Sequence, residues 1–298
     1  MPETQVDKDG REFKFTSIDF ERVRKLIYDH AGISLGDSKQ ELVYSRLSRR
    51  LRATGISNFT EYLLLLENNN EAEWEEFANS LTTNLTSFFR EAHHFPVLAE
   101  HLRTISGKHP ISLWCSAAST GEEAFTMAMT VVETLGSEAS HVKIIATDLD
   151  TKVLATARAA MYPEEYIAKL SDEVVKRFFL RGTGAQSGMV KIRQELRDIV
   201  TFRQLNLLGN NWSLRAPIDV IFCRNVMIYF DKATQLSILK KFVPLLRHNG
   251  LLFAGHSESF HHAGEYFKLR GKTVYELSPL ARKHAQENER NVSAKDMR

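Results

Sequence analysis

The sequence predicts an α/β fold, in which a doubly wound parallel sheet follows a small all-helical domain. Residues 111–129 and 142–150 each begin with a short apolar run rich in strand-forming residues. A polar turn and a helix-like stretch follow each run, as in a βαβ unit. Before them, from residue 17 to about residue 90, every periodic segment has helical spacing. Ligands of such sheets bind at the carboxyl ends of the strands, so the two turns predict a binding site.

The helical domain is expected over residues 12–90, and the α/β domain over residues 91–280. The first helix begins at Ser17, a favourable N-cap residue, and Gly32 is its stop signal,. Gly55 ends the second helix in the same way,. The helices are expected over residues 17–32, 37–55, 60–67, 71–81 and, as a link between the domains, 91–107.

Further strands of the sheet are expected over residues 199–206, 218–225 and 251–258, with a terminal hairpin over residues 267–277. A helix over residues 232–250 is expected to stop at Asn249 and Gly250,. Apolar and basic residues alternate within residues 189–202, which predicts an antiparallel β-ribbon added to the main sheet, in a subdomain of about residues 183–203. Residues 281–298 are charged and lack periodicity, so we expect a disordered tail.

Composition predicts a soluble globular protein. The chain has 298 residues, of which 43% are hydrophobic and 26% charged, enough for two domains and a sizeable core,. The net charge of +2 is too small to indicate bulk nucleic-acid binding,. No apolar run reaches the ~20 residues that span a bilayer, and the N-terminus does not resemble a signal peptide. Cys115 and Cys223 fall in predicted buried strands, so we expect reduced thiols and a cytoplasmic protein.

The two turns indicate a ligand that is cationic and lacks phosphate. Gly121 stands alone in the first turn, followed by Glu122 and Glu123. Dinucleotide sites use several glycines to approach a pyrophosphate, which these carboxylates would repel. Asp148 ends the second strand, where an acid commonly accepts hydrogen bonds from ribose hydroxyls. These features fit S-adenosylmethionine. The alternative from the turns alone is a flavodoxin-like sheet with acids at its surface.

Five segments resemble the bacterial chemotaxis receptor methyltransferase family (CheR family). In chain order they are LTTNLTSFFREAHHFP, SAASTGEE, ATDLD, IFCRNVMIYFDK and LLFAGHSE. The resemblance covers roughly residues 20–277, with Phe125 standing where the family commonly has a Pro-Tyr pair. It implies a Rossmann-like class I S-adenosylmethionine-dependent methyltransferase domain behind the helical domain. It also implies methyl transfer from S-adenosylmethionine, with S-adenosylhomocysteine as product, to glutamate side chains of chemoreceptors (methyl-accepting chemotaxis proteins).

The resemblance also implies the site residues. Arg90 and Tyr229 are expected to orient the reacting groups. Glu123, Asp148 and Asn225 also lie at the carboxyl ends of predicted strands, which independently indicates that they contact the ligand. Whether Glu122 or Glu123 contacts the cofactor stays open. The implied cofactor contacts are Asn84, Thr86, Arg90, Glu123, Asp148, Asn206, Leu207, Arg224 and Asn225.

Two surfaces are candidates for receptor binding. Basic residues of the second helix form a stripe, which is either a solvated face or a docking surface for acidic receptor helices or a nucleic-acid backbone; the resemblance favours the receptor. The residues are Lys39, Arg46, Arg49, Arg50 and Arg52. The β-ribbon is either a plain extension of the sheet or an edge that accepts an extended peptide, and the resemblance implies that this edge captures a peptide tail of the receptor. We expect no nucleic-acid partner, no membrane insertion and a monomer.

The predicted reaction needs no general base, because a glutamate carboxylate is ionised at neutral pH. His93-His94 and His261-His262 are adjacent pairs, whose side chains would not face one side of a helix, so we expect no metal site. Two other classes compete with a receptor methyltransferase: a nucleic-acid methyltransferase that uses the basic helix, and a catalytically silent adaptor that senses the cofactor.

Overall fold

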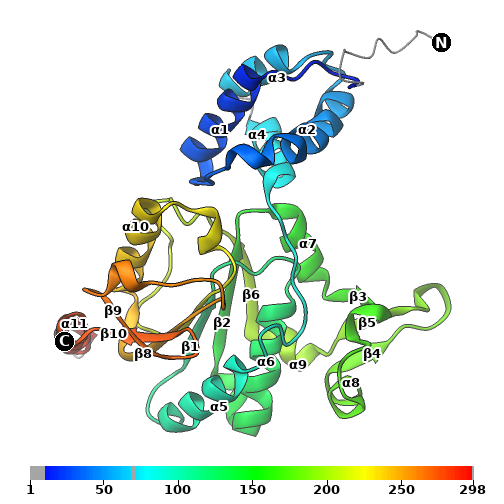
Figure 1. Cartoon of the computed structure of the whole chain (residues 1–298). Helices are drawn as coiled ribbons and strands as arrows, with labels where there is room; N and C mark the ends of the chain where they lie inside the picture. The colour runs from blue at the N-terminus through cyan, green and yellow to red at the C-terminus, as the bar shows by residue number, and fades with distance from the viewer. Residues whose placement is uncertain (1–10, 69–70, 297–298) are drawn as a thin grey trace. The chain divides into compact units, whose positions relative to one another are not determined.

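The computed structural model describes residues 11–68 and 71–296, and its chain divides into two compact units (Figure 1). One contains the residues up to Thr83 together with Tyr229–Asp231, and the other contains Asn84–Ile228 and the residues from Lys232 onward. The first unit therefore ends earlier than the expected boundary at residue 90. Within the described residues, no helix is long and apolar enough to cross a membrane.

The first unit is helical, as the sequence predicts. Thr16, not Ser17, is the N-cap of its first helix: the Thr16 side chain accepts the Asp19 N–H, and the Asp19 carboxylate accepts the Thr16 N–H,. Gly32 and Gly55 end the first two helices in the left-handed conformation, as expected,. The elements are α1 (Ser17–Ala31), a short 3-10 turn η1 (Asp37–Lys39), α2 (Gln40–Thr54), α3 (Phe59–Glu67) and α4 (Glu71–Leu81).

The second unit contains a seven-stranded sheet with the order β6-β2-β1-β7-β8-β10-β9. Pairing is parallel from β6 to β8, and β10 runs antiparallel to both β8 and β9. The strands are β1 (Ser112–Cys115), β2 (Lys143–Asp148), β6 (Val200–Gln204), β7 (Ile218–Cys223), β8 (Leu246–Ala254), β9 (Phe267–Gly271) and β10 (Val274–Leu277). All six residues of β7 are buried, which fits its central place,. The chain reverses strand order between β1 and β7, the position at which such sheets bind ligands.

Helices connect the strands as the alternating pattern predicts. The α/β unit holds α5 (His94–Ile105), α6 (Glu122–Leu135), α7 (Thr151–Ala159), α9 (Gln194–Ile199), α10 (Lys232–Phe242) and α11 (Pro279–Asp296), with single 3-10 turns between elements. Figure 1 shows α5 beside α6 along one face of the sheet. All of residues 122–131 of α6 are buried, among them Phe125, Met127 and Ala128, so this part of the helix is covered on every side.

The structure corrects the predicted ribbon. A separate three-stranded antiparallel sheet forms from β3 (Met161–Pro163), β5 (Met189–Ile192) and β4 (Phe179–Arg181), in that order, and α8 (Asp172–Phe178) leads into β4. Figure 1 shows this small sheet set apart from the main sheet. Of the expected ribbon, residues 194–199 are helix α9 and residues 200–204 are β6, an edge strand of the main sheet. Local alternation did not reveal that the partners of β5 come from earlier in the chain.

Two further predictions were wrong near the C-terminus. Asn249 and Gly250 do not end a helix, because α10 ends at Phe242 and both residues lie inside β8. A Cβ at Gly250 would lie 2.8 Å from the Asp219 carbonyl oxygen, so glycine allows β8 to approach β7 closely where their register shifts,. The expected disordered tail begins as helix α11, where the Glu289 carboxylate accepts the backbone N–H of His248 on β8.

Candidate active site

The turn after β1 lies across the ends of three parallel strands. Its Ser116 N–H donates to the Phe222 carbonyl of β7 at 2.8 Å, and its Ala118 N–H donates to the Thr147 carbonyl of β2 at 2.8 Å. Gly121 closes the turn with φ of 101°, and a Cβ there would lie 2.9 Å from the Cβ of Ala157. Glycine is therefore required twice, for its backbone conformation and for the close approach of α7.

Asp148, at the end of β2, is held by this turn. Its Oδ2 accepts the Ser119 N–H at 2.8 Å, and its Oδ1 accepts the Asp150 N–H at 3.0 Å. Burial raises the pKa of Asp148, and these backbone donors oppose the shift,. Ser119 adopts a φ of 48°, a conformation that is uncommon outside glycine,. Because a carboxylate has about four acceptor positions, Asp148 retains capacity for a ligand hydroxyl.

Glu123 forms a buried ion pair with Arg224, at the start of α6 and the end of β7. The Arg224 Nη1 lies 2.8 Å from Glu123 Oε2, and the Cys115 thiol donates to Glu123 Oε1 at 3.2 Å. Burial raises the pKa of Glu123, and the guanidinium opposes this,. Glu123 and Arg224 are both predicted to contact the cofactor, and in the structure each compensates the charge of the other at the strand ends.

The neighbouring Glu122 has a different environment. It is fully buried, its Oε2 accepts from the Thr120 hydroxyl at 2.6 Å, and its Oε1 has no hydrogen-bond partner within the described part of the chain. Burial raises the pKa of Glu122. An acceptor left unpaired at this position is the kind of group that a bound ligand satisfies.

The segment before α5 is tied to the same ion pair. Arg224 Nη2 donates to the Arg90 carbonyl at 2.6 Å and lies 3.3 Å from Glu91 Oε2. Glu91 also accepts from Asn225 Nδ2 at 3.2 Å and from the His256 N–H at 3.1 Å. Burial alone would raise the pKa of Glu91, but hydrogen bonds from His256 and Asn225 and the charge of Arg224 lower it to about 2,. Sequence reasoning missed Glu91, although it stands in the quoted FFRE segment.

The other predicted cofactor residues of this unit lie at its strand ends or in the segment before α5. Asn84 donates to Asp150 Oδ2 at 2.8 Å, and its carbonyl accepts the Ser119 hydroxyl at 2.8 Å, so it lies against the turn that holds Asp148. Thr86 is half-buried, and Arg90 Nη1 donates to the Leu85 carbonyl at 2.7 Å.

Asn206 and Leu207 follow β6, the strand beside β2. The Asn206 side chain accepts the Leu208 N–H at 2.9 Å, and its carbonyl accepts the indole N–H of Trp212 at 3.2 Å. Leu207 is buried. Lys241 fixes this loop further by donating to the Leu208 carbonyl at 2.8 Å. The structure thus gives both residues a fixed loop next to the Asp148 strand.

Tyr229 belongs to the helical unit. Its hydroxyl donates to the Thr83 carbonyl at 3.3 Å, and its own carbonyl accepts the Ser34 N–H at 2.8 Å. The predicted catalytic pair is therefore divided between the two units, since Arg90 lies in the other one.

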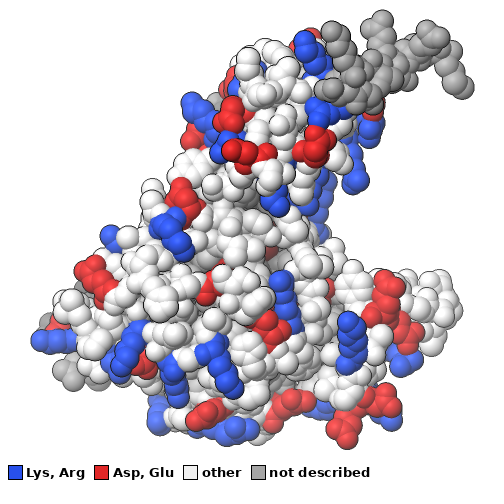
Figure 2. Space-filling view, viewed as in Figure 1, with Lys and Arg blue, Asp and Glu red and all other residues white. Residues whose placement is uncertain are grey.

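The basic stripe of α2 is partly committed to contacts within the helical unit. Arg50 forms ion pairs with Glu73 at 2.8 Å and Glu76 at 2.9 Å on α4. Arg46 donates to the Thr82 carbonyl at 2.6 Å, and Arg52 pairs with Glu12 at 2.6 Å. Figure 2 shows Lys and Arg side chains along the side of the helical unit where α2 lies.

Two residues of the stripe remain available to a partner. Lys39 and Arg49 are exposed, and no salt bridge involves either of them among the residues that the structure describes. These two cations therefore carry the docking prediction better than Arg46 or Arg50.

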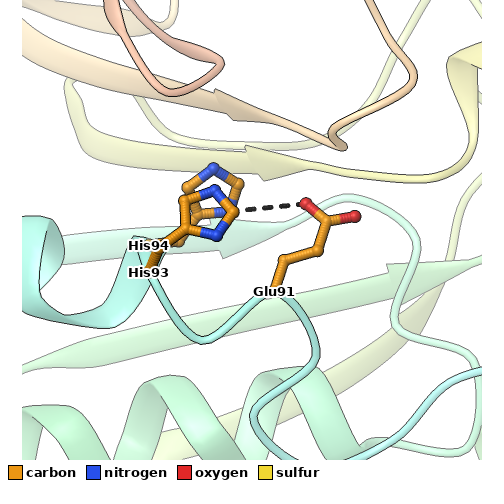
Figure 3. Close-up of side chains that lie close together, drawn as sticks. All are labelled: Glu91, His93 and His94. Atoms are coloured by element: carbon orange, nitrogen blue, oxygen red, sulfur yellow. Dashed lines mark ion pairs between the residues drawn. The ribbon is translucent and has the colours of Figure 1, made fainter.

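Glu91, His93 and His94 are close enough to resemble a metal site, since their ligand atoms lie within 4.8 Å of one another (Figure 3). His94 Nε2 lies 2.9 Å from the Lys272 carbonyl, which assigns the proton to Nε2 and leaves Nδ1 as the acceptor, 3.8 Å from Glu91 Oε2,. A divalent cation on Glu91 would, however, stand beside the buried Arg224 guanidinium and compete with it for the same carboxylate. We therefore interpret Glu91 as a partner of Arg224 and not as a metal ligand.

Two family descriptions match the chain over its two units. Residues 18–82 match "CheR methyltransferase, all-alpha domain", and residues 84–276 match "CheR methyltransferase, SAM binding domain", where SAM is S-adenosylmethionine. The chain belongs to the CheR methyltransferase family. It is a methyltransferase with S-adenosylmethionine as its cofactor, and its acid-lined strand ends fit that cation.

Relatives in the CheR family carry one common name. The chain is 54% identical over 260 residues to the chemotaxis protein methyltransferase of Escherichia coli (strain K12), covering 87% of this chain and 90% of that protein. It is 52% identical over 267 residues to chemotaxis protein methyltransferase 2 of Pseudomonas aeruginosa, covering 89% and 95%. The chemotaxis protein methyltransferase of Borreliella burgdorferi is 34% identical over 267 residues, covering 86% and 93%.

Proposed function

We propose that this enzyme transfers the methyl group of S-adenosylmethionine to glutamate side chains on the cytoplasmic domains of chemoreceptors, and thereby sets sensory adaptation. The observation that carries the proposal is the group of carboxylates around the strand ends: Glu122, Glu123 and Asp148 outnumber the Arg224 guanidinium buried among them. Such a site favours a cationic, phosphate-free nucleoside. The name of the relatives, chemotaxis protein methyltransferase, supports a substrate in the chemotaxis system.

The cofactor supplies an activated methyl group on a cationic sulfur. We assign Asp148 to its ribose hydroxyls, because that carboxylate retains acceptor capacity at the end of β2,. The unpaired Oε1 of Glu122 is the better candidate for a direct polar contact than Glu123, whose two oxygens are occupied by Arg224 and Cys115. The ion pair of Glu123 and Arg224 is then proposed to hold the strand ends in place, with Asn225 next to Arg224 in the chain.

The enzyme does not need to remove a proton from its substrate. A glutamate side chain has a pKa of about 4.3 and is ionised near pH 7. Glu91 is a poor base, because its pKa of about 2 makes it bind a proton only weakly,. The residues of the site therefore contribute mainly by holding the reacting groups in line, an effect worth up to ~7–11 kcal/mol in well-oriented reactions.

Arg90 and Tyr229 are proposed to orient the receptor carboxylate or the methionine end of the cofactor. One guanidinium nitrogen of Arg90 is engaged with the Leu85 carbonyl, and its other donors suit a carboxylate. A tight ion pair between Arg90 and the attacking oxygen would stabilise the ground state. Arg90 must therefore orient the receptor carboxylate without fully neutralising its charge.

Receptor recognition is proposed to use two exposed cations, Lys39 at the end of η1 and Arg49 on α2, which suit acidic receptor helices,. The small sheet offers a second surface. Its edge strand β4 pairs with β5 on one side, and a receptor tail could add to the opposite side by backbone pairing. Calorimetric titration with a receptor-tail peptide tests this second surface, and an absence of binding heat would remove it.

One experiment separates the receptor methyltransferase from the competing classes. The protein is incubated with labelled S-adenosylmethionine and receptor-containing membranes, and the labelled product is then treated with alkali. A glutamyl methyl ester releases methanol in base, whereas a methylated nitrogen of a nucleic acid does not. Label that stays in the product after alkali, or no label at all, would reject the proposed reaction.

A further inference from the structure

Glu258 is a buried carboxylate that the proposed chemistry does not use. It follows β8 and is 5% exposed. Its Oε1 accepts the N–H groups of Val226 and Met227 at 3.0 and 2.8 Å, and its Oε2 accepts those of Asn225 and Gly255 at 3.0 and 2.6 Å. One side chain thus binds three consecutive backbone donors after β7 and one donor after β8.

The turn that Glu258 holds contains a left-handed residue. Asn225 has a φ of 57°, a conformation that asparagine adopts more readily than most other non-glycine residues,. Consecutive N–H groups that converge on one point form a concavity that favours an anion, and they lose free energy if they are buried without any acceptor. The Glu258 carboxylate supplies that anion and so stabilises the bent backbone at Asn225.

The neighbouring glycine supports the same conclusion. A Cβ at Gly255 would lie 2.9 Å from Glu258 Oε2, 2.9 Å from the Asn225 nitrogen and 2.5 Å from Asn225 Nδ2. Only glycine leaves room for the carboxylate to reach the turn. The side-chain amide of Asn225 is fixed as well, since its Nδ2 donates to Glu91.

We infer that Glu258 is a positioning residue for cofactor binding: it holds the turn after β7 so that Asn225 presents its side-chain oxygen at the strand ends. The inference rests on the proposed role of Asn225 at the cofactor. Asn225 Nδ2 donates to Glu91, whereas Oδ1 has no hydrogen-bond partner among the residues that the structure describes, and this acceptor suits a cationic ammonium group,.

The test replaces Glu258 by glutamine. The Glu258→Gln amide keeps the size of the side chain but offers NH₂ to donors where the carboxylate offered an oxygen, so part of the turn loses its acceptor. We expect the affinity for S-adenosylhomocysteine, measured by calorimetry on folded protein, to fall at least ~10-fold. The KM for receptor is expected to stay unchanged, because Glu258 has no role in docking.

Asp219→Asn is the matched control. Asp219 is a fully buried carboxylate on the same strand, β7, at the opposite end from Asn225, and it accepts the Ser112 N–H at 2.9 Å and Arg247 Nε at 2.6 Å. This variant is expected to lower the melting temperature while the folded protein keeps its affinity for S-adenosylhomocysteine. If Asp219→Asn weakened the affinity as much as Glu258→Gln, general destabilisation would explain both results and the inference would be overturned.

Two further results separate the inference from the proposed function. If wild-type protein does not bind S-adenosylhomocysteine, the proposed function fails. If wild type binds and folded Glu258→Gln binds equally well, only the inference fails. Should Glu258→Gln not fold, Glu258→Asp decides by the same criterion, because its carboxylate is one methylene shorter and cannot reach all of the backbone donors.

Discussion

At the scale of residues, the site consists of charged groups that hold one another beneath the strand ends. Arg224 joins Glu123 on α6 to Glu91 and the Arg90 carbonyl in the segment before α5. Partners of this kind compensate for burying charge, whereas removing one partner leaves the other uncompensated. Asp148 differs, because its hydrogen bonds come from backbone N–H groups and leave acceptor capacity for a ligand.

Asp148→Asn tests the assignment of the ribose contact. The amide loses the charge, and its NH₂ group must face the N–H of either Ser119 or Asp150. We expect the affinity for S-adenosylhomocysteine to fall roughly 10- to 100-fold, the range for losing hydrogen bonds to a charged group. Asp198→Asn, which removes the same charge from an exposed position on α9, should leave it unchanged. Equal affinities of Asp148→Asn and wild type would show that Asp148 does not touch the cofactor.

Glu91→Gln tests the electrostatics of the network through the pH dependence of stability. The pKa of Glu91 is about 2 in the folded protein against an ordinary value of 4.5. The ionised group therefore stabilises the fold above pH 4.5, and this contribution is lost as the pH falls from 4.5 toward 2,. We expect urea unfolding to show wild type more stable than Glu91→Gln near neutral pH, with the difference shrinking through that window. A difference that does not change with pH would contradict the proposed ion pairs.

At the scale of elements, α2 has two kinds of basic residue that the sequence does not distinguish. Arg50 faces α4, where Glu73 also accepts the buried Tyr62 hydroxyl at 2.8 Å. Burial raises the pKa of that hydroxyl further above its usual range, and the Glu73 charge adds to the rise. Arg49, the residue just before it in the helix, is exposed to solvent. One cation is thus part of helix packing, while the other is free for a partner.

Arg49→Glu and Arg50→Glu should therefore have opposite consequences. Arg49→Glu is expected to raise the KM for intact receptor and weaken its salt dependence, with stability within about 0.5 kcal/mol of wild type. Arg50→Glu places a carboxylate beside Glu73 and Glu76 and should destabilise the protein by about 1–3 kcal/mol. Receptor methylation kinetics and thermal unfolding of both variants check this, and unchanged kinetics in Arg49→Glu would leave that face as ordinary surface.

At the scale of the whole molecule, the chain combines a cofactor-binding unit with a helical unit that carries Tyr229 and the exposed cations Lys39 and Arg49. In the proposed mechanism, catalysis depends on alignment and on charge neutralisation, and not on proton transfer. The pH dependence of the rate follows from this.

We expect kcat to stay flat between about pH 6 and pH 8, because the substrate carboxylate is fully ionised across that range. Steady-state methylation of receptor-containing membranes at constant ionic strength measures this. A rate controlled by a group with a pKa near 7 would indicate a general base and would contradict the mechanism.

The strand ends could be located from the sequence because an apolar run followed by a polar turn involves only neighbouring residues. Each of the strands β1, β2 and β7 contains an apolar run, Asp148 is the last residue of β2, and Asn225 comes two residues after β7. Sequence reasoning failed where structure depends on distant partners. The three strands of the small sheet, the place of Gly250 beside the Asp219 carbonyl and the packing of α11 on β8 all depend on residues far away in the chain.

The sequence by itself determined the two-unit organisation, the doubly wound sheet and the acidic strand ends, because periodicity and turn chemistry are properties of neighbouring residues. Only the tertiary structure decided which charges are committed to each other. It paired Arg224 with Glu123 and Glu91, Arg50 with Glu73, and Glu258 with the turn after β7. The physical reason is that a buried charge must find its counterpart in space, and neither the spacing nor the type of a residue specifies which distant group that will be.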